Sequence, residues 1–289
     1  MKIKVYFPSL NGIRFIAASL VFIHHFFMSK YCIHHKLLFN GFLDSAGEIG
    51  VTLFFVLSGF LITYLLLIES AECESINLKN FYIRRILRIW PLYFLTLLIY
   101  LLYSYFSNSL DERYFYTKLL LYLLFLPNIA LGLFTQAGFP SQLWSVGSEE
   151  QFYLIWPFFI KFLKTKIIYI LFGLPIVFLA LRIILVQYEK NYVLTENITS
   201  IKYWELFKNY IEFFRVDCMA VGGIFAWHIF MKKNLFILSK PTQVIVWLIL
   251  LSLLFSGFNY PIINHPTYSI LFGILIVNFA VNKCLLFTL

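Results

Sequence analysis

Charged side chains are scarce in this sequence, and no polar stretch is long enough to form a separate soluble domain. Only 13% of the residues are charged, whereas 61% are hydrophobic. Apolar runs long enough to cross a bilayer recur from end to end, which excludes a soluble globular protein. We therefore predict an integral membrane protein in which residues 1–289 form a single membrane-embedded domain.

Cysteine is also scarce, and its spacing excludes two common kinds of small domain. The four cysteines are widely separated and form no Cys-x-x-Cys pair. Neither a disulfide framework nor a zinc site is therefore indicated. Cys32 lies close to His34 and His35, a set that can ligate a metal, but a loop at the membrane surface explains these residues more simply. We expect no metal site.

The basic residues of this chain indicate how it is oriented in the membrane. The net charge is +9, and it is carried by short clusters at the ends of the apolar runs. Such clusters follow the positive-inside rule and do not indicate nucleic-acid binding. Lys2, Lys4 and Arg14 predict a cytoplasmic N-terminus in the cell membrane. The first apolar run is too long for a signal peptide and lacks a small-residue cleavage site, so we expect it to remain as an anchor helix.

The apolar runs predict an all-α, polytopic bundle of about eight transmembrane helices with both termini in the cytoplasm. The run within Tyr116–Gln142 is only about half as long as a span needs to be, and Pro127 interrupts it. We predict that this segment is re-entrant or peripheral on the outer side. That arrangement keeps the basic clusters at Lys161–Lys166 and Lys232–Lys240 in the cytoplasm.

Three ionisable residues stand out in the first span. Arg14 and His25 are eleven positions apart, which places them within about 20° of each other around a helix and about 16 Å apart along its axis. His24 points away from that line. An ionisable group in hydrocarbon is costly unless it faces a partner or a polar cavity, so this face is a candidate site. An interfacial arginine and a histidine bonded to a neighbouring helix form an equally weighted alternative.

Three arginines enter the third span within FYIRRILRIWPLY. Arg84, Arg85 and Arg88 extend past the first turn of the predicted helix, and Arg85 and Arg88 are one turn apart on one face. Arginines at a cytoplasmic helix end often only set topology. Guanidinium groups also bind phosphates in bidentate geometry and keep their charge, so an anion site is at least as well supported.

Two adjacent carboxylates, Glu149 and Glu150, lie at the predicted outer start of the fourth span. A helix N-terminus stabilises carboxylates, and Ser145 or Ser148 could cap it. One carboxylate would suffice for that role, whereas a pair among aromatic residues is typical of a buried site. This helix end is predicted at the depth of His25, so a glutamate could orient the imidazole and raise its basicity.

Polar residues recur near the outer end of the sixth span, in FRVDCMAVGG. Arg215 and Asp217 can pair with each other, or they can line the acceptor side of a cavity together with the aromatic Trp144. In the second span, the small residues Ser58 and Gly59 permit close approach of another helix.

Taken together, these segments resemble the acyltransferase-3 family of membrane acyltransferases, which acylate hydroxyl groups of surface polysaccharides and related glycans. The matching blocks are LNGIRFIAASLVFIHHF with its arginine-x10-histidine spacing, GVTLFFVLSGFLITYLL, FYIRRILRIWPLY, LWSVGSEEQFYLIWP and, more weakly, FRVDCMAVGGIFA. Their joint occurrence in order, over roughly residues 9–230, is more specific than any single block.

Two features depart from the family pattern. Thr52 stands where many members have an aspartate. The family usually has ten spans and ends in a segment like GxISYxLYLxH, and no segment here resembles it. From this difference we expect a C-terminally truncated member.

The resemblance implies a cytoplasmic acyl-CoA donor, with acetyl as the default acyl group, and a hydroxyl of an external cell-surface glycan as acceptor. It implies that Arg85 and Arg88, with Arg14, hold the phosphates of coenzyme A. His25 would then act as the general base on the acceptor hydroxyl, oriented by Glu149 or Glu150.

The implied partners are membrane lipid and the glycan acceptor, with no nucleic acid. Trp144 would stack on a sugar, and Arg215 and Asp217 would complete the acceptor side.

Two other interpretations stay open. A transporter or flippase of a glycan precursor would use its intramembrane charges as substrate contacts and would need no acyl-CoA. Inverted repeats would favour that interpretation, and the hydropathy shows none. An inactive remnant would have one wall of its cavity open, and such a chain should be poorly folded and degraded.

Overall fold

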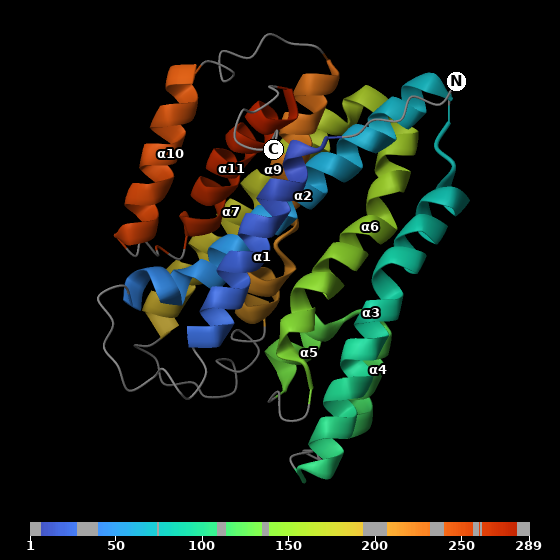
Figure 1. Cartoon of the computed structure of the whole chain (residues 1–289), viewed down its shortest axis with the longest axis vertical. Helices are drawn as coiled ribbons and strands as arrows, with labels where there is room; N and C mark the ends of the chain where they lie inside the picture. The colour runs from blue at the N-terminus through green and yellow to red at the C-terminus, as the bar shows by residue number, and fades with distance from the viewer. Residues whose placement is uncertain are drawn as a thin grey trace. The chain divides into compact units, whose positions relative to one another are not determined.

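A computed structural model of the chain is built from α-helices, and no strand occurs in the residues that it describes (Figure 1). The predicted loop around Cys32 and most of the basic cluster at 232–240 lie outside the described residues. The all-α fold class predicted from the apolar runs is confirmed. The described residues are 7–27, 40–73, 75–108, 114–134, 139–192, 207–231, 240–256, 260 and 262–281.

The chain divides into two compact units. Unit 1 comprises Met1–Ile68, Leu163–Ile183 and Asp217–Leu289, and unit 2 comprises Glu69–Phe162 and Ile184–Val216. The helices that contribute mainly to unit 1 are α1 (Ser9–Phe27), α2 (Asn40–Glu72), α7 (Ile168–Tyr192), α9 (Val216–Phe230), α10 (Lys240–Phe255) and α11 (Asn264–Val281). Those of unit 2 are α3 (Leu78–Phe106), α4 (Phe115–Leu123), α5 (Pro127–Leu133) and α6 (Trp144–Leu163).

Six segments among the described residues are long and apolar enough to cross a membrane. One of them, Ser141–Glu189, contains α6 and most of α7, which are joined by a short 3-10 turn at Lys164–Ile167. A shorter apolar helix, α10, follows the fifth segment in the chain. Counted singly, the helices α1, α2, α3, α6, α7, α9, α10 and α11 correspond to the predicted spans, and the protein is a polytopic helical membrane bundle.

The segment predicted not to cross forms two short helices. With nine residues in α4 and seven in α5, neither approaches the roughly 20 residues that a span needs. The break falls at Phe125, whose φ of 58° is an uncommon left-handed conformation for a residue other than glycine. Pro127 then begins α5, where its missing N–H removes no helical hydrogen bond. Its placement on the outer side of the membrane stays a prediction.

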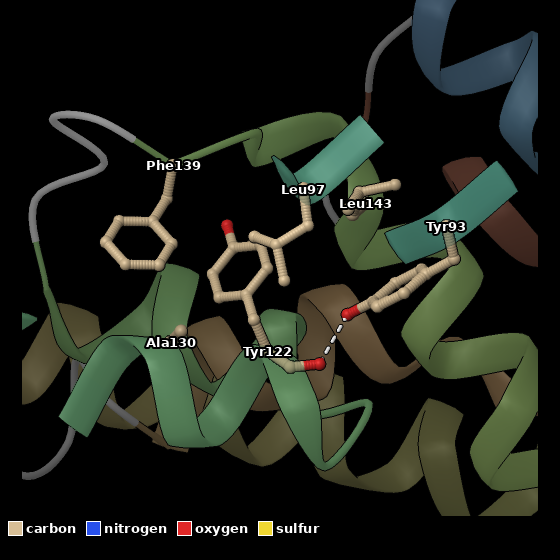
Figure 2. Packing of buried hydrophobic residues seen from close by; sticks show 6 residues of the cluster. All are labelled: Tyr93, Leu97, Tyr122, Ala130, Phe139 and Leu143. Carbon is tan, nitrogen blue, oxygen red and sulfur yellow. Dashed lines mark hydrogen bonds between the residues drawn. The ribbon is translucent and has the colours of Figure 1, made fainter. Parts of the chain in front are cut away.

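A buried cluster fixes these short helices against α3 (Figure 2). Figure 2 shows the Tyr122 ring of α4 between Phe139 and Leu97. The Tyr93 hydroxyl donates to the Tyr122 carbonyl oxygen at 2.7 Å, and the Tyr122 hydroxyl donates to the Pro140 carbonyl oxygen at 3.2 Å. Burial raises the pKa of Tyr122, so its hydroxyl stays neutral and remains a donor. The cluster consists of Tyr93, Leu97, Tyr122, Ala130, Phe139 and Leu143.

Two glycines allow the backbones of α2 and α9 to touch within unit 1. A Cβ added at Gly59 would overlap the carbonyl oxygen of Met219, and one at Gly222 would overlap the carbonyl oxygen of Val56. Because these neighbours are backbone atoms, any side chain at either glycine would force the helices apart. The close approach predicted for this part of the second span is confirmed at Gly59.

Candidate active site

Unit 2 places the arginine-bearing helix beside the glutamate-bearing helix. The Tyr82 hydroxyl of α3 donates to the Leu154 carbonyl oxygen of α6 at 2.7 Å. About two turns further along α3 and one turn nearer the start of α6, Trp90 Nε1 donates to Glu150 Oε2 at 3.3 Å, although the two residues are 60 positions apart in the sequence. Two of the segments that carry the family resemblance therefore meet at one place.

Glu150 presents a carboxylate that its surroundings satisfy only in part. Its Oε1 atom is buried and has no hydrogen-bond partner among the residues that the structure describes. A buried acceptor left without a donor costs about 1–3 kcal/mol. A substrate hydroxyl or an imidazole N–H would supply the missing donor.

Arg85 is the arginine of α3 that turns toward α6. It is half-buried, and its Cζ atom lies 5.4 Å from the ring centroid of Tyr153 and 5.7 Å from that of Phe81. Such distances are in the range of cation–π attraction. Arg85 also interacts electrostatically with Glu149 and Glu150. The guanidinium is thus held among aromatic rings, close to both carboxylates.

The neighbouring arginines have a different environment. Arg84 and Arg88 are exposed, and Nη2 of Arg84 lies 3.7 Å from Oε2 of Glu69. Arg85 and Arg88 are one turn apart, as the spacing predicts, but only Arg85 packs against α6. The exposed guanidinium of Arg88 remains accessible to a ligand, and phosphate binding by this pair stays a prediction.

Trp144, at the first position of α6, packs against a buried arginine. Arg215 is only 2% exposed, and its Cζ atom lies 5.3 Å from the ring centroid of Trp144. Its Nε donates to the Glu212 carbonyl oxygen at 2.9 Å. Arg215 has a positive φ of 39°, and it interrupts the predicted sixth span between a helix at 207–214 and α9. Sugar stacking on Trp144 stays a prediction.

The predicted serine caps of the glutamate helix are wrong. α6 begins at Trp144 and is preceded by a 3-10 turn, so Ser145 and Ser148 both lie inside the helix. The buried Ser148 hydroxyl donates to the Phe213 carbonyl oxygen at 2.6 Å, which ties α6 to the helix at 207–214. The 3-10 turn at Ser141–Leu143 brings the helix start forward to Trp144. The sequence did not reveal this turn, because residue propensities locate helix ends only to within a few residues.

On α1 of unit 1, the two histidines face different surroundings. His24 packs against α2, where a Cβ added at Gly47 would lie 2.6 Å from His24 Cδ2. His25 is exposed, and the site role predicted for it stays a prediction. Near the other end of α1, Arg14 Nη1 donates to Asn11 Oδ1 at 2.8 Å.

A buried ion pair in unit 1 escaped the sequence analysis. Asp217 Oδ2 of α9 accepts a hydrogen bond from Arg182 Nη1 of α7 at 2.6 Å, and the two side chains are 4% and 2% exposed. Arg182 stands alone in the apolar run LALRIILVQ, and that isolation is the signal that could have identified it. The structure therefore gives Asp217 a partner other than Arg215.

The predicted site residues are divided between the two units. Arg14, His25 and Asp217 belong to unit 1. The predicted pairing of His25 with a glutamate joins residues of different units and stays a prediction. The site residues that belong to unit 2 are Arg85, Arg88, Trp144, Glu149, Glu150 and Arg215.

Comparison with known proteins agrees with this arrangement of motifs. The acyltransferase domain family matches residues 7–286. The peptidoglycan O-acetyltransferase OatA of Listeria monocytogenes serovar 1/2a is 34% identical over 174 residues, which cover 56% of this chain and 25% of that protein. The "Putative O-acetyltransferase" of Staphylococcus aureus strain COL is 34% identical over 191 residues, which cover 61% of this chain and 29% of that protein. No solved structure matches the chain.

The family match extends over nearly the whole chain, whereas the aligned part spans only about a quarter of each curated relative. The matched residues include every helix that carries a candidate site residue. The chain belongs to the acyltransferase domain family.

Proposed function

We propose that this chain transfers an acyl group, acetyl by default, from acyl-CoA to a hydroxyl of a cell-wall glycan on the outer face of the cell membrane. The names of the relatives support peptidoglycan as the glycan. The observation that carries the proposal is Glu150, which is held by Trp90 and keeps a buried carboxylate oxygen without a donor beside Arg85.

In the proposed reaction the acceptor hydroxyl oxygen attacks the thioester carbonyl carbon. A carbon–oxygen bond forms, the carbon–sulfur bond breaks, and coenzyme A leaves as a thiolate. His25 accepts the proton of the attacking hydroxyl and returns it to the thiolate, a role worth on the order of 10²- to 10⁴-fold in rate. Glu149 or Glu150 orients the base or the acceptor hydroxyl.

Binding of the donor is assigned to the basic side chains. Arg85 and Arg88, with Arg14, hold the phosphates of the cytoplasmic coenzyme A, because guanidinium groups bind phosphate in bidentate geometry. Trp144 and Arg215 contribute to the acceptor side. Asp217 was assigned to the acceptor side as well, but its ion pair with Arg182 favours a structural role.

The test is transfer of labelled acetyl from acetyl-CoA into peptidoglycan fragments by membranes that contain the chain. We expect label with the parental chain and loss of label with His25→Ala, while His24→Ala keeps activity if it folds. Abundance in the membrane and thermal unfolding of each variant separate catalysis from folding. Absence of incorporation by an abundant parental chain would contradict the proposal, as would full activity of His25→Ala.

A further inference from the structure

Unit 1 contains an apolar cleft that the acyl transfer proposal does not use. Its empty volume is about 500 Å³, part of which opens to the exterior, and its surface is lined by apolar atoms alone. α11 packs against both α1 and α10, so these helices flank it. The lining residues come from α1 (Ile13, Ile16, Leu20), α2 (Ile49, Leu53), α10 (Trp247, Leu250, Leu254) and α11 (Phe272, Leu275, Phe279).

The same helices become polar beyond one end of the cleft. On α1, His24 follows the lining residue Leu20 by one turn, and on α2, Glu48 precedes the lining residue Ile49. These polar positions lie near each other, because His24 packs against Gly47.

On α11 the side chains along one face change from apolar to polar at four-residue spacing, from Phe272 through Tyr268 to Asn264. Asn264 Nδ2 donates to Glu48 Oε2 at 3.5 Å, which joins the polar ends of α11 and α2. The cleft therefore ends in a polar group of side chains contributed by α1, α2 and α11.

Tyr268 gives a second, independent indication of a ligand. Its side chain is 1% exposed, and its ring stacks on the lining residue Phe272 with centroids 6.0 Å apart. Its hydroxyl has no hydrogen-bond partner among the residues that the structure describes, although it interacts electrostatically with Glu48. A buried hydroxyl is normally bonded, so this oxygen has an unused hydrogen bond to offer a ligand.

We propose that unit 1 binds a membrane lipid with a neutral, hydroxyl-bearing head group. A hydrocarbon chain of the lipid occupies the apolar cleft, and the head group contacts Glu48, Asn264 and Tyr268. The carboxylate of Glu48 accepts a hydrogen bond from a sugar or glycerol hydroxyl but repels a phosphate, which selects against anionic lipids. This site does not depend on acyl transfer.

The test uses the purified full chain in nanodiscs with a photoactivatable monoglucosyl diacylglycerol, whose diazirine is in one acyl chain. Phosphatidylglycerol with the same labelled chain is the comparison. We expect the glucosyl lipid to crosslink to the lining peptides more than phosphatidylglycerol does. Equal crosslinking by the two lipids, or no crosslinking to these peptides, would overturn the proposal.

Two matched pairs of variants locate the hydrocarbon chain and the head group of the lipid. Leu275→Trp fills the cleft and should lower crosslinking on the order of tenfold, equivalent to about 1.4 kcal/mol, whereas Ile270→Trp on the exposed side of α11 should not. Tyr268→Phe should lower crosslinking of the glucosyl lipid by about fivefold and leave phosphatidylglycerol unchanged, with the exposed Tyr260→Phe as control.

Thermal unfolding shows which variants remain folded. If Leu275→Trp does not fold, Leu250→Trp fills the cleft from α10 and the same reduction is expected. Unchanged crosslinking in a folded cleft-filling variant would show that the lipid lies elsewhere and would overturn the proposal.

Discussion

Each unit contains a carboxylate with a buried oxygen atom, and the two carboxylates are held in different ways. In unit 1, Asp217 forms a 2.6 Å ion pair with Arg182, and both side chains are almost fully buried. In unit 2, Glu150 accepts a 3.3 Å hydrogen bond from the neutral indole of Trp90. In both, the second carboxylate oxygen has no hydrogen-bond partner among the described residues.

The difference lies in charge compensation. The charge of a carboxylate in direct contact with a buried guanidinium is compensated, and the side chain is fixed in place. Removal of either partner leaves the other partner's charge buried and uncompensated in the unit. Glu150 is held directly only by a neutral donor, and its interaction with the Arg85 guanidinium is electrostatic without a direct ion pair among the described contacts. From this difference we predict that Asp217 serves the stability of unit 1 and that Glu150 takes part in the proposed chemistry of unit 2.

The largest expected effect comes from breaking the ion pair. Arg182→Leu leaves Asp217 buried without its cation and should lower the free energy of unfolding by about 3–5 kcal/mol. Chemical unfolding in mixed micelles measures this decrease in the free energy of unfolding. The double variant Arg182→Leu with Asp217→Leu should recover most of the loss, because it removes both charges. A single variant as stable as the parent would contradict the structural assignment.

At Glu150 we expect a smaller change in the free energy of unfolding but a large effect on the transfer rate. Glu150→Gln keeps the size and can still accept from Trp90, but it removes the charge. Acetyl transfer should fall on the order of 100-fold with little change in unfolding, because the lost interaction is made with the substrate. A loss of stability with an unchanged transfer rate would show that Glu150, like Asp217, has a structural role.

The indole donor should matter less than the carboxylate that it holds. Trp90→Phe keeps an aromatic ring and deletes one hydrogen bond, which is worth about 1 kcal/mol. We expect about a fivefold decrease in transfer rate, measured with the same labelled donor. An effect as large as that of Glu150→Gln would show that the indole contributes more than orientation.

The smallest effect is expected at the exposed ion pair of unit 2. Arg84 and Glu69 are 3.7 Å apart, and the side chain of Arg84 is 61% exposed. Arg84→Ala should change the free energy of unfolding by less than about 1 kcal/mol, with no change in transfer rate. Arg88→Ala is the matched comparison, and it should raise the KM for acetyl-CoA. A larger KM effect at Arg84 than at Arg88 would reverse the proposed phosphate assignment.

Much of the fold could be predicted because hydropathy is a local property. A span is a sum over about 20 neighbouring side chains, so the helices were located from the sequence alone. The incomplete span around Pro127 was also predictable, because a short run and a proline are local features. The start of α6 was not, because a 3-10 turn shifted it beyond the serines that appeared to cap it.

The candidate site divides in the same way. The sequence by itself determined which helices carry arginine, histidine and glutamate, and the family to which the chain belongs. Only the tertiary structure decided that Arg85 rather than Arg88 faces α6, that Trp90 holds Glu150, and that Asp217 pairs with Arg182. These choices depend on helix rotation and on contacts between residues 35 to 68 positions apart, which no local pattern encodes.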